Sequence, residues 1–128
     1  DVSGSSGVLE RGCITYSDES KRELLGVSQK TLEKFGAVSE ECALEMACGA
    51  SARARTEVAV ATTGIAGPTG GTQEKPVGLT YVAWVGPDFK EVRRYQFRWD
   101  RNRNRMMAVY EALRGLLRMT ERISQERK

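Results

Sequence analysis

The 128-residue sequence contains no histidine. This absence excludes a Ser-His-Asp triad or a Cys-His pair within the chain, because both use an imidazole as general base. It also argues against a zinc site, since most such sites include imidazole ligands. The carboxylates form no clustered set along the sequence either. We therefore expect neither a bound metal nor a cofactor.

Cysteine is scarce, and the chain has no long apolar run. Cys13, Cys42 and Cys48 show no metal-ligand spacing and no clear disulfide scheme, so reduced thiols are the favoured interpretation. No stretch approaches the length of a membrane span, and no signal peptide is recognisable. These observations predict a cytoplasmic protein with no membrane partner.

The chain also lacks an initiator methionine and a strong charge of either sign. It opens with Asp-Val-Ser-Gly, like the interior of a longer protein, so we expect residues upstream. The net charge of +3 is small for a nucleic-acid-binding domain, and no nucleic-acid partner is expected. A hydrophobic content of 40% and a charged content of 29% are typical of a globular protein. We interpret residues 1–128 as a single domain.

Hydrophobic periodicity and capping residues predict the order β-α-α-α-β-β-β-α. The small apolar face of the third helix predicts a close neighbour. An alternation of this kind predicts an α/β fold, a three-layer α/β/α sandwich with a mixed sheet. The predicted strands are 11–17, 57–64, 77–86 and 91–99, and the predicted helices are 18–28, 28–36, 39–56 and 101–123, with caps at Ser17, Ser28, Ser39 and Asp100.

Residues 62–78, TTGIAGPTGGTQEKPVG, form a predicted loop with five glycines and two prolines. Glycines after a strand allow the backbone to approach a ligand or wrap an anion. The loop lacks the Gly-Lys-Ser/Thr of a Walker motif, and it leads into a strand, unlike the dinucleotide-binding fingerprint. A wide structural turn explains the composition equally well.

Two further stretches carry candidate functional groups. Lys21 falls in the first turn of a predicted helix, where the helix dipole disfavours a cation, so it is a candidate general base. The alternative is an ordinary surface lysine, and Tyr16 before it could be a core residue. The stretch RWDRNRNRMM, residues 98–107, places four arginines at a strand-to-helix junction. These arginines could bind a phosphate or a carboxylate, or they could simply be solvent-exposed side chains at the basic start of a helix.

Together these stretches resemble the C-terminal domain of the competence/damage-inducible CinA proteins. The resemblance rests on GSSGVLERGCITYSDESKRELLGVSQKTLEKFGAVSEE, TTGIAGPTGGTQEKPVG and WDRNRNR, and it covers essentially the whole chain. Stand-alone members of that family are nicotinamide-nucleotide amidohydrolases. The resemblance implies hydrolysis of the carboxamide of nicotinamide mononucleotide, giving nicotinic acid mononucleotide and ammonia, by a serine–lysine mechanism.

The resemblance also implies roles for individual residues. Lys21 matches the family lysine that acts as base, and Tyr16 matches a tyrosine near the catalytic pair. The start of the glycine loop matches the wall of the substrate pocket, and the arginine junction is a candidate site for the phosphate. The candidate substrate-binding residues are Thr63, Gly64, Ile65, Ala66, Gly67, Gly70 and Gly71 in the loop and Arg101 and Arg105 at the junction.

The chain departs from the family at one important point. The family's nucleophilic serine lies in a Glu-Ser-Cys-Thr-Gly-Gly motif, which this sequence lacks, together with the family's first strand and the helix that starts at the motif. None of Ser3, Ser5 and Ser6 stands in such a motif. We therefore expect a domain that is partial at its N-terminus and inactive alone. Its sheet should have an open apolar edge that other polypeptide covers.

Further expectations concern function and assembly. The glycine loop should face the same cleft as Lys21. Asp100 stands where the family usually has glycine, which affects the expected shape of the arginine junction. A homo-oligomer, a dimer, is the expected assembly. The alternative function is a non-catalytic nucleotide-sensing or scaffold domain within a longer protein.

Overall fold

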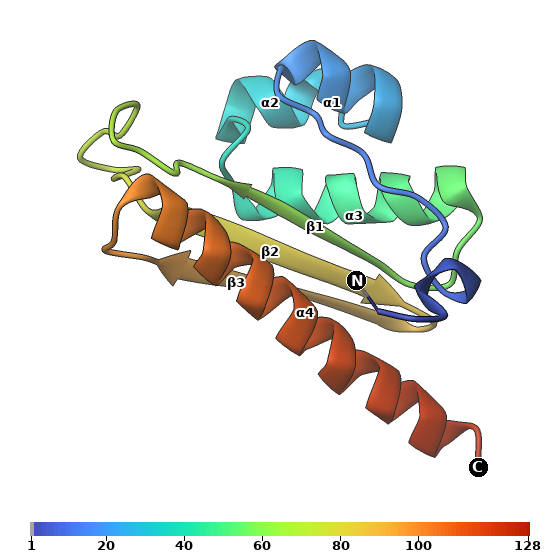
Figure 1. The fold of residues 1–128 in the computed structure, drawn as a ribbon. Coiled ribbons are helices and arrows are strands. Elements are labelled where there is room, and N and C mark those ends of the chain that lie inside the picture. Colours follow the sequence, from blue (N-terminus) through green and yellow to red (C-terminus); the bar gives the residue numbers. More distant parts are fainter. Residues whose placement is uncertain (1) are drawn as a thin grey trace.

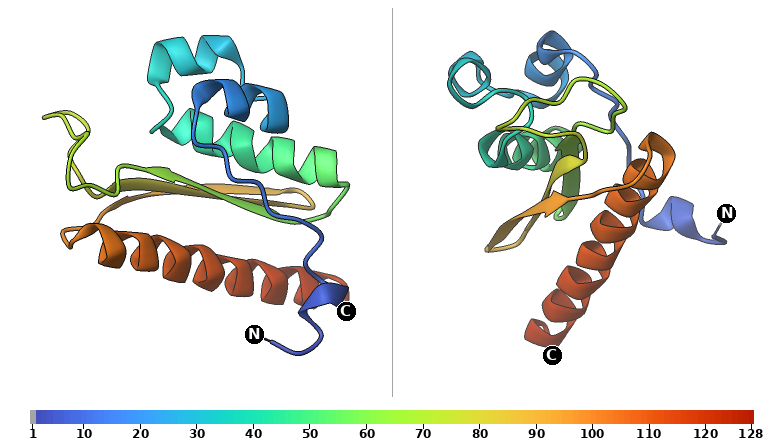
Figure 2. Two further views of the ribbon diagram at one scale, coloured as in Figure 1. Left: turned by 45° about the horizontal axis from the view of Figure 1, so that its top comes forward. Right: turned by 90° about the vertical axis from the view of Figure 1, so that its left-hand side faces the viewer.

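The computed structural model describes residues 2–128, and it places helices on both faces of a small sheet (Figure 1). Helix α3 covers one face of the sheet and α4 covers the other, while α1 and α2 lie on the outer side of α3 (Figure 2). The elements are η1 (Ser5–Gly7), α1 (Asp18–Leu25), α2 (Gln29–Phe35), α3 (Glu40–Ala54), β1 (Ala59–Gly64), β2 (Leu79–Gly86), β3 (Phe89–Gln96) and α4 (Arg101–Glu126).

The α/β sandwich predicted from the sequence is confirmed, but the prediction of a strand at residues 11–17 is wrong. The segment 11–17 is irregular up to the cap of α1, and the sheet of the described residues has three strands in the order β1-β2-β3. Both pairs of strands are antiparallel, so this sheet is not mixed. A strand needs a neighbour for its backbone hydrogen bonds, and within residues 2–128 the segment 11–17 has none.

The predicted helix starts are confirmed by their caps. The hydroxyls of Ser17, Ser28 and Ser39 accept hydrogen bonds from the backbone N–H group three residues further on, at 3.0, 3.1 and 3.1 Å. The carboxylate of Asp100 does the same at the start of α4, at 2.9 Å. Each cap satisfies an N–H group that has no partner inside its helix. Asp100 therefore begins α4 directly.

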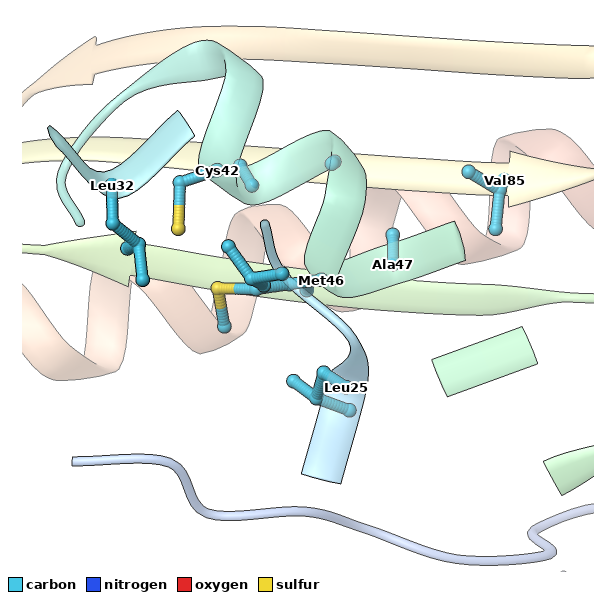
Figure 3. Packing of buried hydrophobic residues seen from close by; sticks show 10 residues of the cluster. Leu25, Leu32, Cys42, Met46, Ala47 and Val85 are labelled. Carbon is cyan, nitrogen blue, oxygen red and sulfur yellow. The ribbon is translucent and has the colours of Figure 1, made fainter. Parts of the chain in front are cut away.

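The first core cluster lies between α3, the two short helices and the sheet (Figure 3). Cys42, Met46 and Ala47 of α3 face Leu25 and the second strand in this cluster. On the same helix, a side chain at Gly49 would overlap the carbonyl oxygen of Leu25. The small face of α3 therefore has the close neighbour that the sequence predicts, and this neighbour is the end of α1.

The second core cluster fixes α4 against the other face of the sheet. Trp84 of β2 is fully buried, and its indole N–H donates a 2.9 Å hydrogen bond to the carbonyl oxygen of Ala112 in α4. The ring lies directly against Gly115, where an added Cβ would overlap three ring atoms. A buried indole needs a partner for its N–H group, so this contact sets the position of α4 along the sheet.

We predict that Gly115→Ala destabilises the protein. Alanine favours a helix by about 1 kcal/mol over glycine, but here its methyl group overlaps a fully buried ring that has no room to move. Overpacking of this kind costs about 1–3 kcal/mol, with more where backbone must shift, so a lower midpoint is expected in urea unfolding. Glu121→Ala, at an exposed position of α4, is the control and should raise or keep the midpoint. A stabilised Gly115→Ala variant would contradict this packing.

Burial also controls the reactivity of Cys42. Desolvation raises the pKa of the Cys42 thiol to about 11, although the nearby charge of Lys21 acts in the opposite direction. Since the thiolate is the reactive form, we predict that iodoacetamide at pH 8 labels the exposed Cys13 of the folded protein and spares Cys42. Peptide mass spectrometry measures both sites, and Cys13→Ser should remove the fast-labelled site.

The same thiol predicts a pH dependence of stability. The folded-state pKa of Cys42 lies above 9.0, the ordinary value of a thiol, so the thiol ionises more readily after unfolding. The corresponding contribution to the free energy of unfolding is complete below about pH 9 and is lost as the pH rises toward 11. Cys42→Ala should flatten this part of the stability profile, and an unchanged slope would be evidence against a neutral buried thiol.

Candidate functional site

A groove of about 1500 Å³ runs along the open side of β1. The N-terminal segment 8–16 forms one wall as it passes from α1 beside α3 and the sheet (Figure 2, left). Strand β1 and the facing side of α4 form the other walls, and the first turn of α1 and the start of the glycine loop reach into the groove. The groove therefore brings together the stretches that the sequence marks as functional.

Lys21 lies in this groove and is not a solvated surface lysine. Only 6% of the residue is exposed, and its ammonium group donates a 2.7 Å hydrogen bond to the carbonyl oxygen of Thr15. Within residues 2–128 no carboxylate forms an ion pair with this ammonium group. A buried amine with a carbonyl acceptor and no counter-ion can exchange a proton with a hydroxyl or water that enters the groove.

Local sequence holds Lys21 in place. The hydroxyl of Ser17 accepts from the backbone N–H of Ser20, and the hydroxyl of Ser20 accepts from the backbone N–H of Ser17, so the two residues form a capping box. Gly49 allows α1 to pack closely on α3. Helix α1, whose first turn contains Lys21, is thus fixed at both ends.

Tyr16 lies at the rim of the groove. Its side chain is exposed, with 85% of the residue accessible to solvent, so the alternative interpretation as a core residue is wrong. The ring lines the groove one residue after the carbonyl group that binds Lys21.

Hydrogen bonds from side chains at the start of α4 hold the glycine loop in place. The guanidinium of Arg101 donates to the carbonyl oxygen of Gly67 at 2.9 Å, and the side-chain amide of Asn104 donates to that of Ala66 at 3.0 Å. The oxygen of the same amide accepts from the backbone N–H of Trp99 at 3.1 Å. Asn104 is almost completely buried, so one side chain joins the loop, the end of the sheet and the last helix.

Sequence reasoning selects Arg101 for its charge and misses Asn104. The signal available in the sequence is the spacing of the two residues, because side chains three apart on a helix share a face. Since Arg101 is a candidate for the substrate site, Asn104 one turn further on is a candidate as well.

The glycines of the loop mainly leave room for neighbouring segments of the same chain. An added Cβ at Gly67 or Gly71 would come within 2.5 to 2.6 Å of Val77, and one at Gly78 would overlap the carbonyl oxygen of Phe97. Gly70 has a positive φ of 93° and only Ile65 nearby. The wide structural turn therefore explains these glycines without a ligand, and the loop folds tightly onto its own returning strand.

The groove unites some of the candidate residues and leaves others outside. Thr63 lines the groove, but its hydroxyl already donates a 2.7 Å hydrogen bond to the carbonyl oxygen of Ala37. The candidates that line the groove are Lys21, Tyr16, Thr63, Gly64, Ala66, Arg101 and Arg105, and those that do not are Ile65, Gly67, Gly70 and Gly71. The first part of the loop and Lys21 thus share one cleft, while the later glycines lie away from it.

The described part of the chain has neither a metal-binding cluster nor a membrane-spanning helix. Among residues 2–128 no group of three or more cysteine, aspartate and glutamate side chains is placed to hold a metal ion. In the same residues no helix is both long and apolar enough to cross a membrane.

The chain is similar to known proteins over nearly all of its length. The family model described as the CinA C-terminal domain matches residues 1–120. The nicotinamide-nucleotide amidohydrolase PncC of Enterobacter agglomerans is 46% identical over 119 residues, which are 92% of this chain and 73% of that protein. A CinA-like protein of Kosmotoga olearia is 50% identical over 113 residues, which are 88% of this chain but 27% of that protein.

Solved structures agree with the sequence relatives. The competence/damage inducible protein CihA from Agrobacterium tumefaciens superposes with a TM-score of 0.91 at 43% identity, covering 93% of this chain and 73% of that one. A CinA superfamily protein from Escherichia coli gives a TM-score of 0.78 at 39% identity, covering 82% of this chain and 61% of that one. The chain spans less than a third of the length of several competence-damage inducible relatives that it matches.

We predict that Asn104→Ala releases the glycine loop from α4. The substitution leaves the carbonyl oxygen of Ala66 and the N–H group of Trp99 without their partner, which costs about 1–3 kcal/mol of the free energy of unfolding. Hydrogen exchange should also accelerate between residues 65 and 78, where the loop rejoins the sheet. Asn102→Ala, an exposed change on the same helix turn, is the control. Equal effects of the two substitutions would show that the bridge contributes nothing.

Proposed function

The chain belongs to the CinA C-terminal domain family, and from this premise we propose that it supplies the general base and part of the pocket of a nicotinamide-nucleotide amidohydrolase. The substrate is nicotinamide mononucleotide, and the products are nicotinic acid mononucleotide and ammonia. The observation that carries the proposal is the buried ammonium group of Lys21, which opens onto the same groove as the glycine loop and two arginines. The similarity to PncC supports the substrate class.

The chemistry requires a base because an amide is a poor electrophile. A serine hydroxyl attacks the carboxamide carbon and gives up its proton, and ammonia then leaves with a proton from the same base. Water hydrolyses the resulting acyl-enzyme and restores the serine. Lys21 in its neutral form is the proton acceptor of this scheme, since the sequence has no histidine. Since the sequence contains no Glu-Ser-Cys-Thr-Gly-Gly motif, the proposal assigns the attacking serine to polypeptide outside these 128 residues.

The arginines of the junction suit the phosphate of the nucleotide. Arg101 uses one nitrogen to hold the carbonyl oxygen of Gly67, and its charge remains available at the groove wall. Arg105 follows one helical turn later, on the same wall. Two guanidinium groups near a helix N-terminus provide both donors and a favourable potential for a phosphate dianion. Lys21 and the arginines then act on opposite ends of the substrate.

The test is a chimaera in which this chain replaces the matching part of the Enterobacter agglomerans PncC. We predict that Lys21→Met lowers the rate of ammonia release from nicotinamide mononucleotide by on the order of a hundredfold or more, because a positioned base contributes at least that factor. Lys21→Arg should fail almost as badly, since a guanidinium stays protonated and accepts no proton. Both variants should bind the nucleotide with little change in Kd.

Lys30→Met is the matched control, because Lys30 is an exposed lysine on the neighbouring helix α2. It should leave turnover and thermal stability unchanged. Near-normal turnover in Lys21→Met would remove this lysine from the mechanism. A chimaera that binds the nucleotide without hydrolysing it would favour the nucleotide-sensing alternative. Ammonia release by the 128-residue chain alone would mean that the nucleophile lies within it.

A further inference from the structure

The half-buried Lys75 reaches from the returning limb of the glycine loop to helix α2. Its ammonium group donates a hydrogen bond to the carbonyl oxygen of Phe35, the last residue of α2, which lies 40 positions away in the sequence. The last carbonyl groups of a helix have no partner inside it and form the negative end of its dipole, so a cation is a favourable partner. Within residues 2–128 no carboxylate forms an ion pair with Lys75, so its charge is directed to the end of α2.

A tight turn fixes the backbone of Lys75. Its N–H group donates to the hydroxyl of Thr72 at 3.0 Å, and the N–H group of Thr72 donates to the carbonyl oxygen of Lys75 at 2.8 Å. Pro76 follows, and the backbone of a residue before a proline has a restricted range of conformations. The side chain of Lys75 therefore extends toward α2 from a fixed point of the loop.

Gly36 leaves room for the ammonium group of Lys75. This glycine directly follows Phe35 and ends α2 with a φ of 80°, a conformation that residues with a side chain rarely adopt. An added Cβ would lie only 3.0 Å from the Nζ atom of Lys75. The missing side chain therefore lets α2 end and Lys75 bind at the same place.

The segment 36–39, between α2 and α3, also holds the outgoing limb of the loop. The hydroxyl of Thr63, near the end of β1, donates a 2.7 Å hydrogen bond to the carbonyl oxygen of Ala37. Thr63 and Lys75 thus attach the two limbs of the loop to neighbouring positions at the end of α2. Bonds from α4 hold the residues between the limbs.

This attachment lies close to Lys21. Burial is the main cause that raises the pKa of the Cys42 thiol, and the charges of Lys21 and Lys75 both act against it. Both ammonium groups therefore lie near the first turn of α3, which contains Cys42. Helix α1, which carries Lys21, and helix α2, which binds Lys75, both pack on α3. The bond of Lys75 thus fixes the loop against the layer of helices that carries the candidate base.

We propose that Lys75 is a positioning residue that sets the distance between the glycine loop and the ammonium group of Lys21. The N–H group of Gly78 donates to the carbonyl oxygen of Ile65, so a displaced returning limb also moves the residues beside Ile65 that line the groove. A displacement of about 1 Å can lower turnover on the order of a hundredfold. This catalytic consequence rests on the proposed function, whereas the attachment of the loop does not.

Hydrogen exchange of the 128-residue chain tests the attachment. Lys75→Met keeps the length of the side chain and removes its ammonium group, so exchange at residues 70–75 should accelerate about fivefold or more while α3 is unchanged. Lys34→Met is the matched control, because Lys34 is an exposed lysine in the last turn of α2 that makes no bond to the loop. It removes the same charge from the same helix end and should leave exchange unchanged. Equal exchange in the two variants would overturn the proposal.

Turnover of the PncC chimaera tests the positioning role. Lys75→Met should lower kcat about tenfold and change KM less than about twofold, because the proposed phosphate ligands Arg101 and Arg105 lie on α4 and do not depend on Lys75. A raised KM with unchanged kcat would mean that Lys75 binds the nucleotide directly, and turnover equal to that of Lys34→Met would also contradict the proposal. If the chimaera with Lys75 intact releases no ammonia, the proposed function fails, and the exchange experiment still decides whether Lys75 holds the loop.

A double-mutant cycle separates the contact from general stability. Gly36→Ala crowds the ammonium group and strains the backbone, and only the crowding requires Lys75. The loss of kcat caused by Gly36→Ala should therefore be at least about threefold smaller in the Lys75→Met background than in the unchanged chimaera, since residues in contact have non-additive effects. Circular dichroism confirms the fold of each variant. Equal losses in both backgrounds would show that Lys75 does not act through its place beside Gly36.

Discussion

A buried ammonium group requires an acceptor, and in this protein that requirement connects the N-terminal segment to the rest of the fold. Removing a charge from water is costly unless hydrogen bonds replace its hydration. The carbonyl oxygen of Thr15 provides one for Lys21, so the segment before α1 must pass where this bond can form. The capping box fixes the start of the helix, and the missing side chain at Gly49 lets its end approach α3. The burial of Lys21 therefore determines where the segment before α1 runs, and that segment forms one wall of the groove.

The glycine loop owes most of its composition to the fold, and it also contributes to the groove. Most of its glycines are needed because the loop folds against Val77 and the end of β3, not because a ligand approaches them. The first residues of the loop nevertheless lie on the groove, and Asn104 and Arg101 hold their carbonyl groups against α4. A tightly folded loop gives the groove a rigid wall, and in the proposed function this wall positions the substrate.

Sequence patterns predict the parts of this fold that depend on near neighbours. The four helix caps are correct because a cap is a bond between residues three apart, and the hairpin of β2 and β3 is correct because only Pro87 and Asp88 separate the strands. The prediction of a strand at residues 11–17 is wrong because a strand requires a neighbouring strand to pair with, and composition alone does not show whether such a neighbour is present. The burial of Lys21 and the role of Asn104 also escape prediction, since the latter joins residues 38 positions apart.

The order of the strands in the sheet has a consequence for how the chain folds. Since β1, β2 and β3 are neighbours in both sequence and space, the sheet forms by closing two loops, one of them a tight turn. Short loop closures cost little entropy, and topologies dominated by local pairing fold rapidly. The hairpin can form first, with β1 added after the glycine loop closes. The nascent chain can thus form this three-stranded sheet from neighbouring segments alone.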